Sequence, residues 1–217
     1  MSSAAEILAR GPWEPAAVET CWREEEFQVD PAAAAEADRK LARLRERGSP
    51  AHDGLAARMV SYEQTERGLR LELQPIRWAL RLSSADAGDS VSALCVVRRS
   101  DGSWLAGRRA GWVASWAGRW ALGAGGSVEV HENPAHTLAR ELEEEWGVRG
   151  GGLQVAALVR LVNRMVMVVG QVWLDGDQAV TPDHEHDEFA WWPPEVERWP
   201  PEADAPLRTI GALLADA

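Results

Sequence analysis

Apolar residues recur at helical spacing between Asn133 and Gly147. The stripe consists of Ala135, Leu138, Ala139, Leu142 and Trp146. Asn133 is a favourable N-cap, Pro134 suits the first helical position, and Gly147 suits the position after the last turn. The pattern predicts a helix of about thirteen residues that docks its apolar stripe on a sheet.

Strand patterns lie on both sides of this helix. The predicted strands are Val91 to Arg99, Trp104 to Arg109, Leu153 to Val162 and Val166 to Leu174. Asp101-Gly102 and Asn163-Arg164 suit the turns between them, and the run of glycines at 150–152 marks a break after the helix. A last helix is expected from Ala205 to Ala217.

The first 85 residues differ from this pattern and are expected to form a small α+β extension. Residues 1–20 are expected to be loosely ordered, and a helix should run from Asp30-Pro31 to about Arg47. Alternating leucines at 69, 71 and 73, and apolar residues at 76, 78 and 80 after Pro75, predict two half-buried strands. Residues 83–90 suit a linker, so we expect a second domain over residues 86–217.

Three glutamates stand at i, i+3 and i+4 on the predicted helix, namely Glu141, Glu144 and Glu145. This spacing places them on one face, where we expect them to converge on one spot. The helix dipole disfavours negative charge in the last turns by ~0.3–1 kcal/mol for each residue. Such a face is either a solvated acidic surface or a site for a hard divalent cation, which prefers oxygen ligands.

The stretch from Gly126 to Val148 resembles the Nudix box of the MutT-like Nudix hydrolases. All the fixed positions are filled, by Gly126, Glu132, Arg140, Glu141, Leu142, Glu144, Glu145, Gly147 and Val148. The resemblance implies an α/β fold, the Nudix α/β/α sandwich with a mixed sheet, preceded here by the N-terminal extension.

The resemblance also implies roles for residues of the box. Glu141, Glu144 and Glu145 would be ligands of Mg²⁺, with Mn²⁺ as the alternative, and the backbone carbonyl of Gly125 would add a ligand. Glu144, Glu145 and Arg140 are the catalytic candidates within the box. Gly126, Glu132 and Gly147 are expected to be structural, with Glu132 and Arg140 clamping the loop onto the helix.

Candidates outside the box come from three segments. Arg109, at the end of a predicted strand, is a candidate for a phosphate or base contact because a planar guanidinium matches phosphate oxygens. Glu185 is the preferred further ligand or general base, and Glu188 is the second. Trp120 either stacks on a nucleobase or packs in the core.

The histidines are weaker candidates. His184 and His186 suit a solvated polar loop better than a transition-metal site, because no third ligand is suitably spaced. His131 and His136 occupy variable positions of the box and are expected to face solvent or support the site from behind.

Composition restricts the class of partner. The formal charge of −11, from 34 acidic and 23 basic residues, argues against binding to nucleic acid or an anionic membrane. No apolar run suits a signal peptide or a membrane span, so a cytoplasmic protein is expected. Cys21 and Cys95 show no metal-ligand spacing and are expected to be free thiols.

The resemblance implies cleavage of a diphosphate bond, by water, in a nucleoside diphosphate linked to another group X. A Nudix-fold sensor that binds a nucleotide metabolite without hydrolysis is the alternative. An isopentenyl-diphosphate-isomerase-like activity is a weaker one, since no cysteine lies near the box. Submotifs that report the substrate are missing, so the small-molecule substrate stays open, as does the homodimer common among Nudix proteins.

Overall fold

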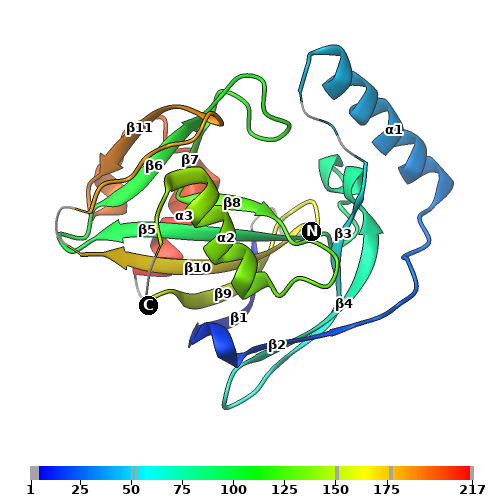
Figure 1. The fold of residues 1–217 in the computed structure, drawn as a ribbon, viewed down its shortest axis with the longest axis horizontal. Helices are drawn as coiled ribbons and strands as arrows, with labels where there is room; N and C mark the ends of the chain where they lie inside the picture. Colours follow the sequence, from blue (N-terminus) through cyan, green and yellow to red (C-terminus); the bar gives the residue numbers. More distant parts are fainter. Residues whose placement is uncertain (1–4, 50, 52, 150–151, 176–177, 216–217) are drawn as a thin grey trace.

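The structure is a computed structural model that describes residues 5–49, 51, 53–149, 152–175 and 178–215 (Figure 1). A mixed sheet lies at its centre. The strand order is β1 (Glu6–Trp13), β9 (Gln154–Arg160), β10 (Val166–Leu174), β5 (Val91–Arg99), β6 (Trp104–Arg109) and β11 (His186–Trp192). Strands β10 and β5 pair in parallel and the other neighbours are antiparallel. Two short strands complete the sheet, with β7 (Trp120–Leu122) on β6 and β8 (Ala124–Ser127) on β5.

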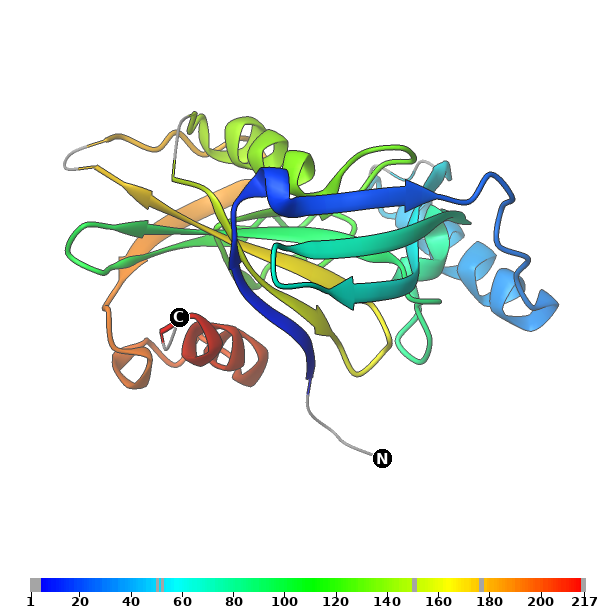
Figure 2. The ribbon, with the colours of Figure 1, turned by 90° about the horizontal axis from the view of Figure 1, so that it is seen from below.

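Helices cover both faces of this sheet, as the view from below shows (Figure 2). Helix α2 (Pro134–Trp146) lies on one face and α3 (Ala205–Ala215) on the other, with the short turn η3 (Val196–Arg198) before α3. The chain therefore has the mixed α/β sandwich that the sequence predicts. No helix among the described residues has both the length and the apolar character needed to cross a membrane.

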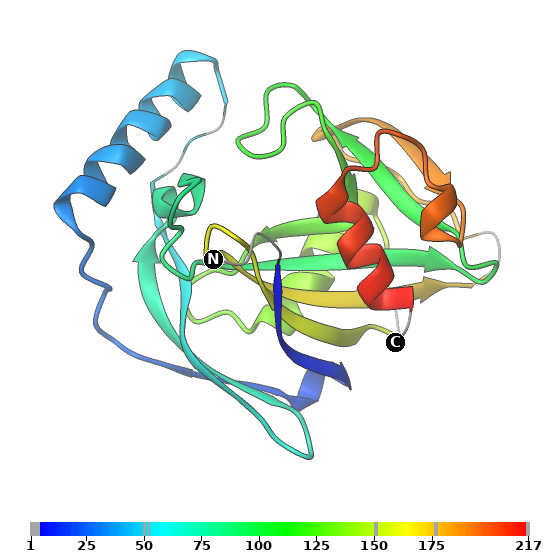
Figure 3. The same cartoon turned by 180° about the vertical axis from the view of Figure 1, so that it is seen from behind.

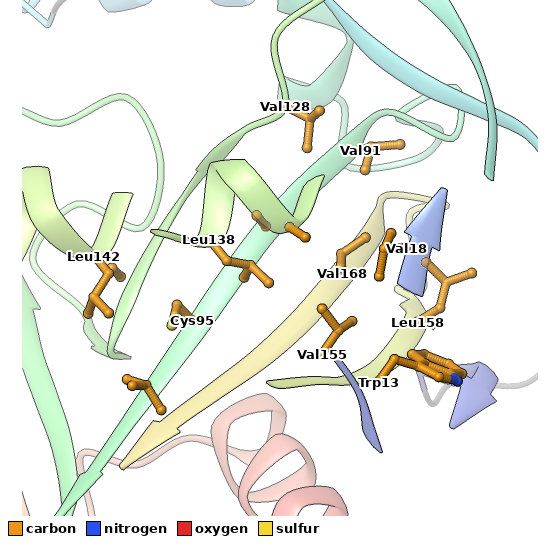
Figure 4. Close-up of a cluster of buried hydrophobic side chains, with 14 of the residues drawn as sticks. Trp13, Val18, Val91, Cys95, Val128, Leu138, Leu142, Val155, Leu158 and Val168 are labelled. Carbon is orange, nitrogen blue, oxygen red and sulfur yellow. The ribbon is translucent and has the colours of Figure 1, made fainter. Parts of the chain in front are cut away.

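The core between α2 and the sheet is made mainly of aliphatic side chains (Figure 4). Leu138 and Leu142 of α2 pack in one cluster with Cys95 of β5 and Val168 of β10. A second cluster on the other face contains Trp104, Trp192, Trp199 and residues of α3. Each face of the sheet is thus committed to its own core, which fixes the orientation of α2.

The N-terminal extension contains α1 (Pro31–Glu46) and a three-stranded sheet. Its strands are β2 (Val18–Trp22), β4 (Leu69–Arg77) and β3 (Leu55–Gln64), in that order. Asp30 caps α1 by accepting hydrogen bonds from the N–H groups of Ala32 and Ala33 at 2.9 and 3.3 Å, as predicted. Strand β3 was not predicted from the sequence.

The prediction of two strands separated by Pro75 is wrong. Strand β4 continues through Pro75, and the chain then turns into the 3-10 helix η2 (Trp78–Leu82). Pro75 is tolerated because the β2 pairing ends at residue 73, and on that side Pro75 takes part only through its carbonyl, which accepts from the N–H of Phe27 at 2.8 Å. Ala79 and Leu80 are both buried, which the tight turn allows and alternation in a strand would not.

The expectation of loose order in residues 1–20 is also wrong for the described part. Strand β1 forms the edge of the main sheet beside β9, and the turn η1 (Pro15–Ala17) leads from it into β2. Figure 3 shows this first segment crossing from the main sheet to the extension. The division of the chain at residue 85 stays a prediction, although β1 belongs by pairing to the second part.

The expected linker over residues 83–90 ends in a buried ionic joint. Asp89 is 6% exposed in its side chain and lies 3.1 Å from Arg160 of β9 and 3.9 Å from Arg58 of β3. It also pairs with Arg164 in the turn between β9 and β10. The segment therefore fastens the extension to the main sheet, rather than spacing the two apart.

The remaining predicted elements match the structure closely. Strands β5, β6 and β10 have the predicted bounds, and β9 is shorter than predicted. Arg164 has a positive φ in the predicted turn and Gly102 a φ of 84° in the hairpin. Gly150, Gly151 and the last two residues of the predicted final helix lie outside the described residues.

Candidate functional site

Helix α2 carries the acidic residues and both of its ends are capped as predicted. The side chain of Asn133 accepts a hydrogen bond from the N–H of Ala135 at 2.9 Å. Gly147 is left-handed, with a φ of 64°, and its N–H bonds to the carbonyl of Glu143. Four residues of the apolar stripe are buried, while Ala139 is exposed and Thr137 is buried instead.

The clamp predicted between Glu132 and Arg140 is present. Arg140 Nε donates to Glu132 Oε1 at 3.0 Å, and Nη2 donates to Oε2 at 3.2 Å. The N–H of Glu129 also donates to Glu132 at 3.1 Å. Burial opposes the charge on Glu132, but Arg140 and the Glu129 N–H hold the pKa of Glu132 below its usual range. The clamp thus ties the loop before α2 to the helix.

Glu145 is the most buried of the three glutamates, with a side chain 6% exposed. Its carboxylate lies 3.5 Å from Arg109 Nη1 and accepts a long hydrogen bond from the N–H of Gly125 at 3.4 Å. Burial is the main cause that raises the pKa of Glu145 to about 8, against the attraction of Arg109 and with repulsion from Glu141 and Glu185. The positive charge of Arg109 is too little to offset the burial of this carboxylate in its charged form.

Glu141 explains why a glycine fits at position 126. A Cβ placed on Gly126 would lie 2.0 Å from Glu141 Oε1, so the carboxylate lies directly over the glycine. Arg140 Nη1 lies 2.8 Å from Glu141. Burial raises the pKa of Glu141 in spite of this arginine.

Glu144 departs from the prediction that the three carboxylates converge. Its side chain is 58% exposed and pairs with Arg140 at 3.0 Å. Among the residues that the structure describes, no three acidic, histidine or cysteine side chains are grouped closely enough to hold a metal ion. The three carboxylates stay apart because Arg140 pairs with Glu141 and Glu144, whereas Arg109 pairs with Glu145.

Arg109 and Glu185, both predicted from outside the box, meet at Glu145. Arg109 Nη2 donates to Glu185 Oε2 at 2.8 Å while its Nη1 approaches Glu145. The N–H of Ala110 donates to the Glu185 carbonyl at 2.7 Å, which fixes this loop against the end of β6. The fold therefore places two carboxylates and one guanidinium together from three distant segments.

His186 is the residue that the sequence interpretation placed wrongly, because it is not part of a solvated loop. Its side chain is 1% exposed, with Nδ1 3.1 Å from Asp183 and Nε2 3.9 Å from Glu145. The ring packs on Trp146 with centroids 4.6 Å apart. Burial is the main cause that lowers its pKa. The aromatic residues that follow, which favour a strand, are the sequence signal for β11.

The other three histidines of the sequence prediction lie at the surface, as expected. His184 is exposed and stacks on Trp112 with centroids 5.2 Å apart. His131 and His136 are exposed as well.

Glu188 and Trp120 lie away from Glu145. Glu188 is exposed and pairs with Arg108 at 3.5 Å, and Arg108 alternates with Arg109 along β6, so it points to the other face. Trp120 lies opposite Arg108 and contacts Trp192 in the core beside α3. This placement favours core packing for Trp120 and does not support a substrate contact for either residue.

Comparison with known proteins gives one family match. A family model described as NUDIX domain matches residues 89–213. No curated protein matches the chain significantly.

Solved structures similar to this chain share only part of it. They include a MutT/nudix family protein from Enterococcus faecalis (20% identity, 48% of this chain and 43% of that chain, TM-score 0.42). A MutT protein from Methanosarcina mazei Go1 is 26% identical over 58% of this chain and 92% of that chain, with a TM-score of 0.45. An Ap4A hydrolase from C. elegans is 20% identical over 58% of this chain and 99% of that chain, with a TM-score of 0.43. The chain thus spans less than half of the Enterococcus protein and nearly all of the other two.

Proposed function

Because this chain belongs to the NUDIX domain family, we propose that it hydrolyses a diphosphate bond in a nucleoside diphosphate linked to another group X. It is an enzyme of the Nudix pyrophosphohydrolase type, and two phosphorylated products leave. The observation that carries the proposal is the meeting of Glu145, Arg109 and Glu185 beside the loop of the box. Two carboxylates, one of them buried, next to a guanidinium suit a site for phosphate chemistry.

Members of this family use divalent cations, and the chemistry of the residues present fits one once Glu144 leaves Arg140 to join Glu141 and Glu145. The donors offered by Glu141, Glu144 and Glu145 are all carboxylate oxygens, the ligands preferred by Mg²⁺ and Mn²⁺. The raised pKa values of Glu141 and Glu145 also favour a metal site. Burial disfavours the charged form of each carboxylate, and a nearby cation would offset that cost. These three residues, with the carbonyl of Gly125, would hold the metal.

When bound, the metal would neutralise charge on the diphosphate and polarise the bond to be broken. The protein's own groups would do the rest. Arg109 would bind an oxygen of the phosphate that leaves, because its guanidinium already lies among the carboxylates. Arg140, held by Glu132, would keep the box loop and the acidic face of α2 in place.

Glu185 is our preferred general base. Its carboxylate is partly exposed, unlike that of Glu145, so it can reach a water molecule. Water would attack one phosphorus atom, the anhydride P–O bond would break, and the proton of the water would pass to Glu185. Glu144 and Glu145 are the alternatives for this role.

Neither cysteine suits the isomerase-like alternative. Cys95 is fully buried, and burial raises the pKa of its thiol to about 12. Cys21 is exposed on β2, in the extension. A reactive thiol must be exposed and close to the reacting group, but Cys95 is buried and Cys21 belongs to a different sheet from the box loop.

The test is a substrate panel with product identification. The purified chain would be incubated with Mg²⁺ or Mn²⁺ and with nucleoside triphosphates, nucleotide sugars, ADP-ribose, dinucleotides and prenyl diphosphates. Mass spectrometry should find two phosphorylated products from one class, and chelation of the metal should abolish them. Binding of a nucleotide without any product, at saturating metal, would instead support the sensor.

A further inference from the structure

A groove of about 720 Å³ lies between the extension and the loop of the Nudix box. The extension contributes Leu55, Ala56 and Trp78, and the box contributes Ser127, Arg140 and Glu141. The groove therefore borders the acidic face of α2 directly. Any group attached to a diphosphate at that face has room to extend against the extension.

The turn η2, which contributes Trp78 to this groove, is firmly held. Trp78 Nε1 donates to Ser127 Oγ at 2.9 Å, and Lys40 Nζ donates to the carbonyl of Leu82 at 2.8 Å. Ala79 and Leu80 are buried in a cluster with residues of α1. Figures 1 and 3 both show η2 between α1 and the main sheet. Its side chains therefore have fixed positions relative to the box.

Arg81 stands in this turn, three residues after Trp78, where a 3-10 helix places side chains on one face. Its guanidinium carbon lies 5.6 Å from the centre of the Trp78 ring. Burial lowers the pKa of Arg81 to about 10, while Glu141 raises it and Arg109 lowers it further. Arg81 is therefore still charged at neutral pH, and its charge interacts with those of Glu141 and Arg109.

The guanidinium of Arg81 is also unpaired among the described residues. Within the described part of the chain, no side chain or backbone group forms an ion pair or hydrogen bond with its guanidinium. Arg109 and Arg140, in contrast, each contact two or more carboxylates. A half-buried guanidinium without a partner has lost part of its hydration, and the charge of Arg81 is repelled by that of Arg109. An anion that bridges them would remove both costs.

We propose that Arg81 binds a phosphate group of the diphosphate substrate, so that the N-terminal extension completes the substrate site. The inference rests on the proposed function, because it assumes that the diphosphate lies at the acidic face of α2. The ligand it selects is a diphosphate rather than a single phosphate. One phosphate then reaches Arg109 and the other reaches Arg81, which lies beside Trp78 of the groove.

The experiment measures binding of methylenediphosphonate, which cannot be hydrolysed, and of inorganic phosphate, both with MgCl₂, by calorimetry. The variants are Arg81→Ala and Arg81→Lys. Arg39→Ala is the control, because it removes the same charge from an exposed residue of α1. Arg81→Ala should weaken diphosphonate binding about tenfold or more. Phosphate binding should change less, Arg81→Lys should recover part of the loss, and Arg39→Ala should match the wild type.

An unchanged ratio of diphosphonate to phosphate affinity in Arg81→Ala would overturn the inference. Should that variant fail to fold, as judged by circular dichroism, Arg81→Lys and Arg81→Gln carry the same comparison. The result is separable from hydrolysis. If diphosphonate binding depends on Arg81 but the chain cleaves no substrate, only the proposed activity is refuted. If the chain cleaves its substrate and Arg81→Ala leaves the KM unchanged, only this inference is refuted.

Discussion

The carboxylate of Glu145, on α2, lies 3.5 Å from the guanidinium of Arg109, at the end of β6. This ion pair joins the helix that carries the acidic face to the sheet on which the helix packs. Arg109 also holds Glu185, so one cation is shared by two carboxylates from different segments. Substrate phosphate would compete with these carboxylates for the same guanidinium.

Replacing Arg109 should therefore cost turnover more than stability. We expect Arg109→Ala to lower kcat/KM by about 100-fold or more, the usual loss for a group that stabilises developing charge. Steady-state kinetics on the substrate found in the panel would measure it. Arg108→Ala is the matched control, because its side chain points to the other face and pairs with exposed Glu188. Equal losses in the two variants would contradict the role of Arg109.

The buried carboxylate of Glu145 predicts a pH-dependent stability in metal-free buffer. Its pKa is raised from an ordinary 4.5 to about 8, so the folded state binds the proton more tightly than the unfolded chain. This contribution to the free energy of unfolding is complete below about pH 4.5 and is lost as the pH rises through 8.

Glu145→Gln, which mimics the protonated form, should lack this pH dependence. Its melting temperature without metal should exceed that of the wild type at pH 8, and the difference should shrink towards pH 5. Mg²⁺ should raise the melting temperature of the wild type and not that of the variant. Thermal scans across this pH range would measure both effects, and parallel curves for the two proteins would contradict the prediction.

Gly126→Ala should displace the Glu141 carboxylate, because the new Cβ would lie 2.0 Å from its oxygen. The end of a glutamate side chain moves easily, so the fold should persist while turnover at low Mg²⁺ falls by about tenfold. Higher Mg²⁺ should restore part of it. Gly111→Ala is the control, since a Cβ there meets nothing within 4 Å. A metal titration of activity that is identical for both variants would exclude this explanation for the glycine.

Asp89→Asn should destabilise the chain by roughly 3 kcal/mol, because a buried carboxylate that three arginines share would lose its charge. Urea unfolding followed by fluorescence would measure the loss. Glu6→Gln, at an exposed partner 3.8 Å from the same Arg160, should cost no more than about 1 kcal/mol. A similar small effect for Asp89→Asn would show that the joint between the extension and the sheet is not ionic.

Local signals explain which parts of the site could be predicted from the sequence. Asn133 and Gly147 define the ends of α2 through contacts within a few residues, and Arg140 meets Glu132 over a short loop. His186 and Arg81 could not be placed in this way. His186 is buried because distant Trp146 covers it, and Arg81 lies near the box loop only because Trp78 of η2 docks on Ser127.

The same distinction applies to the fold. Strands with regular alternation and clear turns, such as β5 and β10, match their predicted bounds. Strand β4 passes through Pro75 because its neighbour β2 ends two residues earlier, and no property of Pro75 itself reports that. Strand β1 contains Gly11 and Pro12, which obscure its pattern, and it is ordered by pairing with β9, far away in the sequence.

Strand β1 has a consequence for solubility. It covers the edge of β9, whose N–H and C=O groups would otherwise be free to pair with another chain. Pro12 has no N–H group to offer to an incoming strand, so β1 is itself a poor template for further pairing. A chain shortened to begin at residue 86 would keep the whole Nudix box and yet expose β9, and we expect it to aggregate.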